Sequence, residues 1–175
     1  YEVGMSHLGM KILYEIINAR EDALCERVFA PWIDLADAMR SKGVPLFTIE
    51  SRRAVRDFDI VGFTLQYEMS YASILDMLSL AGIPLLASER GPGDPLVIAG
   101  GPCAFNPEPL HAFVDAFTIG DGEESVLEIL DAVKASKAAG EPREALLLRL
   151  SRITGTYVPA FYGAAYHPDG RLKAF

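Results

Sequence analysis

The residue types that most often carry out catalysis are sparse in this sequence and lie far apart. Its 175 residues include three histidines and two cysteines. Cys103 has no histidine near it in the sequence, so we expect a small buried hydrophobic side chain rather than a nucleophile. His7 could serve as a ligand or a base, although a lone histidine is more often a structural residue. Because no nucleophile–base pair can be assembled, a stand-alone enzyme is the least favoured interpretation.

A glycine pair, Gly120 and Gly122, follows a predicted strand and opens a predicted helix, as the dinucleotide fingerprint does. The third glycine of that fingerprint is replaced by Ser125. Three carboxylates also lie where a pyrophosphate would bind: Asp121, Glu123 and Glu124. A helix N-terminus favours an anion, and here the protein's own side chains supply it. The sequence therefore excludes a Rossmann NAD site and a P-loop.

The elements that position these residues alternate between strand and helix. Helical spacing of apolar residues, with Ser6 as the expected N-cap of the first helix, predicts helices over about residues 6–19, 31–43, 68–80, 122–138 and 142–153. Apolar runs predict strands over residues 23–30, 46–49, 58–65, 96–99 and 116–119. A turn at 167–170 predicts a hairpin between residues 157–166 and 171–175.

This alternation predicts an α/β fold, a doubly wound, Rossmann-like or flavodoxin-like parallel sheet with helices on both faces in three α/β/α layers. Such a fold normally opens with a strand before its first helix. The sequence has no such strand, unless it is reduced to the residues around Tyr1, so we expect it upstream of residue 1. Both ends are interpreted as cuts through a longer polypeptide.

Charge and composition narrow the range of partners. The formal net charge is -8 and the sequence pI is near 4.9, so nucleic acid and anionic membranes are not expected as partners. No apolar run approaches the roughly 20 residues that span a bilayer. Two cysteines far apart fit a reducing compartment, so we expect a cytoplasmic protein without a disulfide framework.

Ligands of open parallel sheets bind at the carboxyl ends of the strands. Four segments of the sequence lie there, residues 4–9, 64–68, 100–107 and 120–124, and all are rich in glycine or small polar residues. One such segment alone would be an ordinary turn, but four together favour a ligand site. The candidate binding residues are Ser6, His7, Thr64, Leu65, Gln66, Glu68, Gly100, Gly101, Pro102, Gly120, Gly122 and Glu123.

Several long segments, taken in order, resemble one known family. They are residues 1–9, 28–32, 50–53, 62–68, 99–109, 119–124 and 157–162, which include Gly62-Phe63-Thr64-Leu65-Gln66-Tyr67-Glu68 and Ala99-Gly100-Gly101-Pro102-Cys103-Ala104-Phe105-Asn106-Pro107. Together they resemble the N-terminal region of bacterial fusion proteins that join a cobalamin (vitamin B12)-binding-type domain to a radical SAM domain. The resemblance covers essentially the whole chain.

The resemblance implies that cofactor binding and catalysis lie in different domains. Residues 1–153 would form the B12-binding-type domain, and residues 154–175 a hairpin or connector toward a downstream radical SAM domain, the expected partner in the same chain. That domain would hold the 4Fe-4S cluster and S-adenosylmethionine through a Cys-x3-Cys-x2-Cys motif, which Cys25 and Cys103 cannot form. The fragment itself would then have no complete catalytic site.

Within this resemblance, Thr64 and Leu65 resemble the small hydroxyl position after the third strand, and Gly100 and Gly101 resemble the paired glycines beside the cobalamin nucleotide tail. His7 is the candidate cobalt ligand, although the Asp-x-His-x-x-Gly motif of known ligands is not reproduced around it. Two hypotheses stay open. The domain either holds cobalamin at the carboxyl edge of its sheet, or is a degenerate domain that serves substrate binding or interdomain docking without cobalamin.

Overall fold

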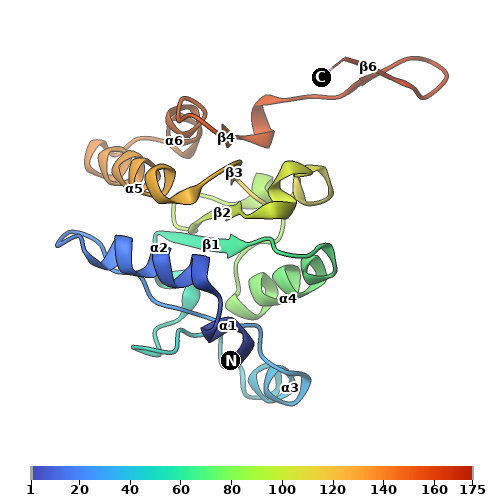
Figure 1. Ribbon diagram of the computed structural model, residues 1–175. Coiled ribbons are helices and arrows are strands. Elements are labelled where there is room, and N and C mark those ends of the chain that lie inside the picture. The colour runs from blue at the N-terminus through green and yellow to red at the C-terminus, as the bar shows by residue number, and fades with distance from the viewer. Residues whose placement is uncertain (1, 175) are drawn as a thin grey trace.

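The computed structural model describes residues 2–174, so expectations that fall on Tyr1 and Phe175 lie outside the described residues. Figure 1 shows a central sheet covered by helices on two faces. The helices are α1 (Glu2–Met5), α2 (Leu8–Asn18), α3 (Ile33–Lys42), α4 (Tyr71–Ala81), α5 (Gly122–Ala139) and α6 (Arg143–Leu150). The strands are β1 (Ile60–Thr64), β2 (Leu96–Gly100), β3 (Ala116–Thr118), β4 (Thr156–Tyr157), β5 (Ala165–Tyr166) and β6 (Leu172–Ala174).

The main sheet has the order β1-β2-β3-β4. Strands β1, β2 and β3 are parallel, while β4 pairs antiparallel with β3 through Phe117 and Tyr157. The three parallel strands are the apolar runs of the sequence, as expected of strands covered on both faces. The predicted three-layer α/β fold is confirmed, and the sheet is mixed rather than wholly parallel because the chain returns along β3 after α6.

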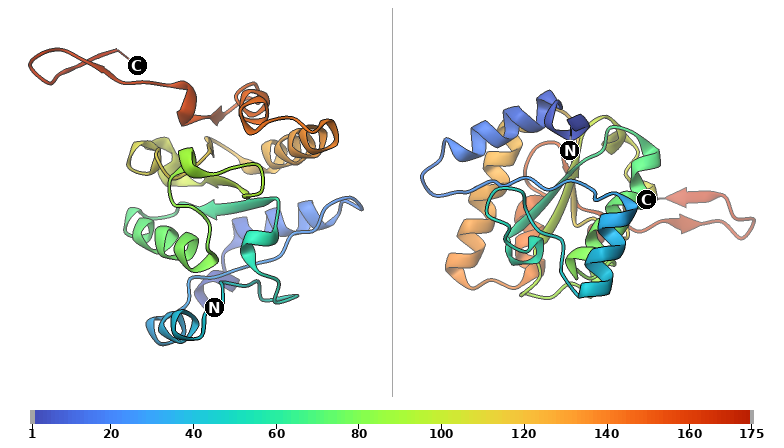
Figure 2. Two further views of the ribbon diagram at one scale, coloured as in Figure 1. Left: turned by 180° about the vertical axis from the view of Figure 1, so that it is seen from behind. Right: turned by 90° about the horizontal axis from the view of Figure 1, so that it is seen from below.

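Alternate side chains of the parallel strands point to opposite faces of the sheet and pack into two separate cores. Val61, Val97 and Phe117 belong to a core that includes residues of α3 and α4. Leu96 and Ala116 point the other way, into a second core under α5 and α6. Helix α2 lies beside α5 on this second face, while α3 and α4 lie together on the first (Figure 2).

Two predicted strands are not formed. Residues 23–30 are irregular, and residues 46–49 contribute only an isolated antiparallel bridge between Phe47 and Ala54. A strand requires a neighbouring ladder, and the backbone of residues 23–30 bonds instead to the side chains of Asn18 and Glu50 and to Ile49. The strand predicted over residues 23–30 is therefore wrong, because no neighbouring strand among the described residues pairs with this segment.

A buried ion cluster ties the amino ends of β2 and β3 together. The Asp115 carboxylate accepts hydrogen bonds from Arg90 at 2.9 Å, from Arg143 at 2.8 Å and from the Val97 backbone N–H at 2.7 Å. Arg90 also donates to the carbonyl oxygens of Pro84, Leu85 and Phe113. Such dense pairing offsets the desolvation penalty of burying these charges.

The predicted C-terminal hairpin is present but shorter than expected, as β5 and β6, which extend away from the sheet with exposed side chains (Figure 1). The first predicted arm, residues 157–166, is not one strand, because Tyr157 belongs to β4 of the main sheet and Pro159–Phe161 form a 3-10 helix. The turn between β5 and β6 is closed by the Gly170 N–H, which donates to the His167 carbonyl oxygen at 2.9 Å. The proposed boundary near residue 153 stays a prediction, although β4 joins the main sheet beyond it. Within residues 2–174, no helix has the length and apolar character needed to cross a membrane.

Candidate functional site

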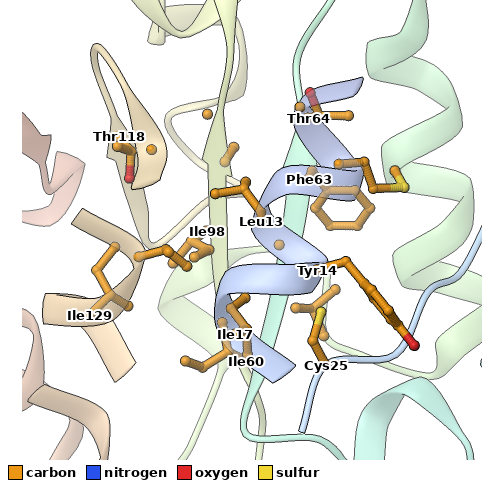
Figure 3. A pocket seen from close by; sticks show the side chains of 18 of the residues that line it. Leu13, Tyr14, Ile17, Cys25, Ile60, Phe63, Thr64, Ile98, Thr118 and Ile129 are labelled. Carbon is orange, nitrogen blue, oxygen red and sulfur yellow. The ribbon is translucent and has the colours of Figure 1, made fainter. Parts of the chain in front are cut away.

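A cavity of about 440 Å³ opens at the carboxyl edge of the sheet and continues down between α2, α5 and the open side of β1. Figure 3 shows side chains of α2, the sheet and α5 converging on it, including Leu13, Ile98 and Ile129. The candidate residues that line this cavity are His7, Thr64, Gln66, Gly100, Gly101, Gly120, Gly122 and Glu123. The structure thus brings four separate sequence segments to one cleft, as the strand-end argument predicted.

The floor of the cleft is a row of three residues in register across the sheet. Thr64 pairs with Gly100, and Gly100 pairs with Thr118, so all three present the same face. A Cβ atom at Gly100 would lie 3.5 Å from the Thr118 carbonyl oxygen, in ordinary contact, and would take up space above the row. Two hydroxyl groups therefore flank a bare backbone position, which suits a flat ligand with polar edges.

Gly101 is required by the backbone. Its φ is +105°, and a Cβ atom there would lie 3.1 Å from the Leu65 carbonyl oxygen and 3.0 Å from the Gln66 Nε2. Gln66 in turn donates from Nε2 to the Thr64 Oγ1 at 2.8 Å. The loop after β2 is thereby packed against the end of β1, and the Thr64 hydroxyl is oriented at the rim of the cleft.

The far wall of the cleft is the start of α5. Gly120 has a φ of +112° and leads into Asp121, the N-cap residue, and Gly122 lies beside the Leu13 side chain, 3.5 Å from where its Cβ would be. Glu123 stands in the first helical turn and complements the positive end of the helix dipole. This wall of the cleft carries negative charge.

His7 is the N-cap of α2, in place of the predicted Ser6. Its Nδ1 accepts a hydrogen bond from the Met10 N–H at 3.0 Å. A neutral imidazole that accepts at Nδ1 carries its proton on Nε2. Ligation of cobalt through Nε2 would require the ring to shift that proton to Nδ1 and give up the cap. The cobalt-ligand role of His7 stays a prediction, and the cap is the role that the geometry gives it.

Four other candidates do not line the cleft: Ser6, Leu65, Glu68 and Pro102. Leu65 is fully buried, and its carbonyl oxygen accepts from the Cys103 N–H at 2.9 Å. Glu68 lies next to Cys103 and Tyr71 on the α4 side of the sheet. Partial desolvation and the Glu68 charge raise the pKa of the Cys103 thiol, which supports the expectation of a packing residue rather than a nucleophile.

Several lining residues were missed by sequence reasoning. Thr118 ends β3 as Thr64 ends β1, and a threonine two residues before Gly120 at the end of an apolar run was the signal that could have identified it. The lower cavity is apolar and is lined by Leu13, Tyr14, Ile17, Cys25, Ile60 and Phe63 (Figure 3). Burial raises the pKa of the Cys25 thiol. These residues were assigned to a helix face and strands, and only the structure shows that they border a cavity.

Among residues 2–174, no group of three or more His, Cys, Asp or Glu side chains could hold a metal ion. The cleft has small residues at its floor, hydroxyl groups at its rim and an apolar interior. This arrangement can bind and orient a planar organic group but presents no set of reacting side chains of its own.

Comparison with known families shows which family this chain belongs to. The model of the N-terminal region of radical SAM proteins matches residues 9–159, which is most of the chain. No curated protein and no solved structure matches it.

Proposed function

Since this chain belongs to the family of N-terminal domains of radical SAM proteins, we propose that it is the module that holds cobalamin for a radical SAM domain in the same polypeptide. The cofactor would lie at the carboxyl edge of the sheet, where the cleft opens. The family description supports an accessory module of a radical SAM protein, and the cleft supports the choice of cofactor.

The observation that carries this proposal is the row Thr64, Gly100 and Thr118 with open space above it. A benzimidazole tail is flat and must slide between a sheet and its covering helices. Side chains at Gly100 or Gly122 would occupy that space, and Gly122 already lies close to Leu13 of α2. The threonine hydroxyls are placed to donate or accept hydrogen bonds at the edge of the tail.

Bound cobalamin would supply alkyl or electron transfer at cobalt, chemistry that belongs to the cofactor. The protein would bind and orient it beside the domain that holds the 4Fe-4S cluster and S-adenosylmethionine. Because His7 already caps α2, we expect cobalt to be bound without a protein histidine.

The test is a titration of the purified protein with hydroxocobalamin, followed by gel filtration and visible spectroscopy. We expect cobalamin absorbance to co-elute with the protein, and Gly100→Val to weaken retention by roughly tenfold or more, since a tail of this size depends on a few well-placed contacts. Gly93→Val is the matched control, because the site of its Cβ is open space in a distant loop. Failure of the full-length protein to retain cobalamin would disprove the proposal.

The alternative, a docking or substrate-binding module without cobalamin, is favoured by two observations. His7 is engaged as a helix cap, and acidic residues line the α5 wall of the cleft. If cobalamin is not retained but Gly100→Val weakens binding of the separately expressed radical SAM domain, the cleft serves docking.

A further inference from the structure

Strand β1 has the composition of a central strand but lies at the edge of the sheet. Central parallel strands are apolar on both faces, whereas natural edge strands are protected by charge, proline or bulges. The strand reads Ile-Val-Gly-Phe-Thr and carries none of those protections. Gly62 and Thr64 are nonetheless exposed, and Phe63 is only half-buried. The side of β1 away from β2 is therefore an apolar edge without a paired strand, covered only by α2 and residues 24–28.

The backbone of β1 has hydrogen-bonding groups directed at this open side. The Asp59 carbonyl and the Leu65 N–H bond to the β2 strand, at 2.9 and 2.6 Å. Because successive residues of a strand alternate between its two neighbours, residues of odd number face β2. The N–H and C=O groups of Ile60, Gly62 and Thr64 then point away from β2, and no hydrogen bond joins them to another residue within 2–174.

The irregular segment of residues 24–28 faces this open side of β1. Both it and β1 line the lower cavity, so the cavity lies between them. Helix α2 forms the roof, yet none of its residues is fully buried, although its apolar face carries Leu13 and Ile17. An amphipathic helix normally buries such a face against a sheet. A strand between β1 and residues 24–28 would give the apolar face of α2 a surface to pack on. We call this space the β1 slot.

The course of α2 fixes the direction of such a strand. Its first turn lies at the carboxyl edge with Gly120, and Ile17 lies near Ile60 at the amino end of β1 (Figure 3). Helix α2 therefore runs antiparallel to β1, as the helix of a βαβ unit does after a strand parallel to β1. A strand in the β1 slot would end where α2 begins, and residues 24–28 would follow as the next strand position on its far side.

We propose that the β1 slot receives one apolar β-strand, parallel to β1 and hydrogen-bonded to Ile60, Gly62 and Thr64, and that the residues immediately preceding Tyr1 in the longer polypeptide supply it. This strand completes the parallel sheet, and it converts residues 24–28 from irregular chain into a paired outer strand. It occupies the lower, apolar part of the cavity and leaves the Thr64, Gly100 and Thr118 row open, so a ligand of the proposed function would be confined to the space above that row.

The test compares the full-length protein with a version that begins at Tyr1, both without cofactor. Hydrogen exchange is measured at the amides of Ile60, Gly62 and Thr64, and we expect exchange about 100-fold slower in the full-length protein, because a paired amide must wait for local opening. Cys25 is an independent reporter, since it borders the slot. Its labelling by a maleimide should slow roughly tenfold in the full-length protein, while Cys103, which lies outside the cavity lining, changes little.

A pair of proline variants separates this proposal from a general effect of chain length. Gly62→Pro removes an N–H that points into the slot, so it should lower the urea midpoint strongly in the full-length protein and weakly in the version that begins at Tyr1. Val61→Pro removes an N–H that faces β2, and it should be damaging in both proteins.

Equal exchange at Ile60, Gly62 and Thr64 in the two proteins would overturn the proposal. So would protection that appears only at high protein concentration together with dimers in native mass spectrometry, because a second copy would then supply the strand. Cobalamin retention is measured separately, so loss of that function leaves this result unaffected.

Discussion

The two ends of the same three parallel strands are built in opposite ways. At the amino end, the Asp115 carboxylate is enclosed by Arg90, Arg143 and a backbone N–H, and every one of these contacts is shorter than 3 Å. At the carboxyl end, Thr64, Gly100 and Thr118 leave space that no side chain fills. The amino end, which we call the closed end, therefore fixes the register of the strands. The carboxyl end, which we call the open end, uses that register to align a cleft.

This difference between the two ends explains why the sheet stays stable with glycines at the carboxyl ends of its strands. Glycines at strand ends contribute little packing and cost conformational entropy on folding. A buried, fully paired cluster at the other end holds β2 and β3 in place, so the carboxyl edge does not need side chains to define its geometry. Binding sites are commonly less well packed than the rest of a protein, because the open space that a ligand needs contributes nothing to the stability of the fold.

The largest expected effect is on the closed end. Asp115→Ala leaves Arg90 buried without its carboxylate, and breaking a buried pair in this way typically costs about 3–5 kcal/mol of unfolding free energy. Urea denaturation followed by circular dichroism measures this loss. Asp59→Ala is the matched control, because its ion pair with Lys137 is exposed, and we expect little change. A loss no greater than that of the control would show that the cluster does not hold the sheet.

Gly101→Ala should have the next largest effect, this time at the open end. The residue has a φ of +105°, and a new Cβ would lie within 3.1 Å of the Leu65 carbonyl oxygen. Left-handed strain and the close contact together should cost about 2 kcal/mol. Gly93→Ala, which has open space and no positive φ, serves as the control. Equal midpoints for the two variants would mean that the loop after β2 adapts freely.

Much of this arrangement could be predicted from the sequence. The continuous apolar runs at residues 58–65, 96–99 and 116–119 identified β1, β2 and β3, because strands buried on both faces leave that pattern. The helix over residues 122–138 was placed within one residue of α5. The segments rich in glycine then identified the carboxyl edge, since ligands bind there in parallel sheets.

The rest depended on neighbours that a sequence does not reveal. Residues 23–30 have strand composition, but a strand exists only when another lies beside it, and none of the described residues does so. Thr118 became a site residue only through its register with Gly100. Ser6 is a preferred N-cap residue and His7 is not, so the sequence favours the wrong one of the two. Only the contact from the Met10 N–H to the His7 Nδ1 shows which side chain caps α2.

His7→Ala should have a smaller effect, confined to stability. Loss of the bond to the Met10 N–H removes the cap of α2 and should cost about 1 kcal/mol. His7→Asn can restore a cap acceptor and should recover most of that loss. If cobalamin binds, its visible spectrum should be the same in the wild type and both variants. A spectral shift in both, with stability unchanged, would instead identify His7 as a cobalt ligand.

The smallest effect concerns Cys103, in the loop that follows β2 at the open end. Desolvation, with the nearby Glu68 charge, raises the pKa of its thiol, so less thiolate is present near neutral pH than in the unfolded chain. The raised pKa means that the folded state holds this proton more tightly. Its contribution to stability is complete below the usual thiol range and is lost as the pH rises through the raised pKa. We expect iodoacetamide to alkylate Cys103 more slowly in the native protein than in urea at pH 8, with the difference shrinking as the pH rises. Faster alkylation in the native protein would show an activated thiol, and the open end would then hold a reacting group as well as a cleft.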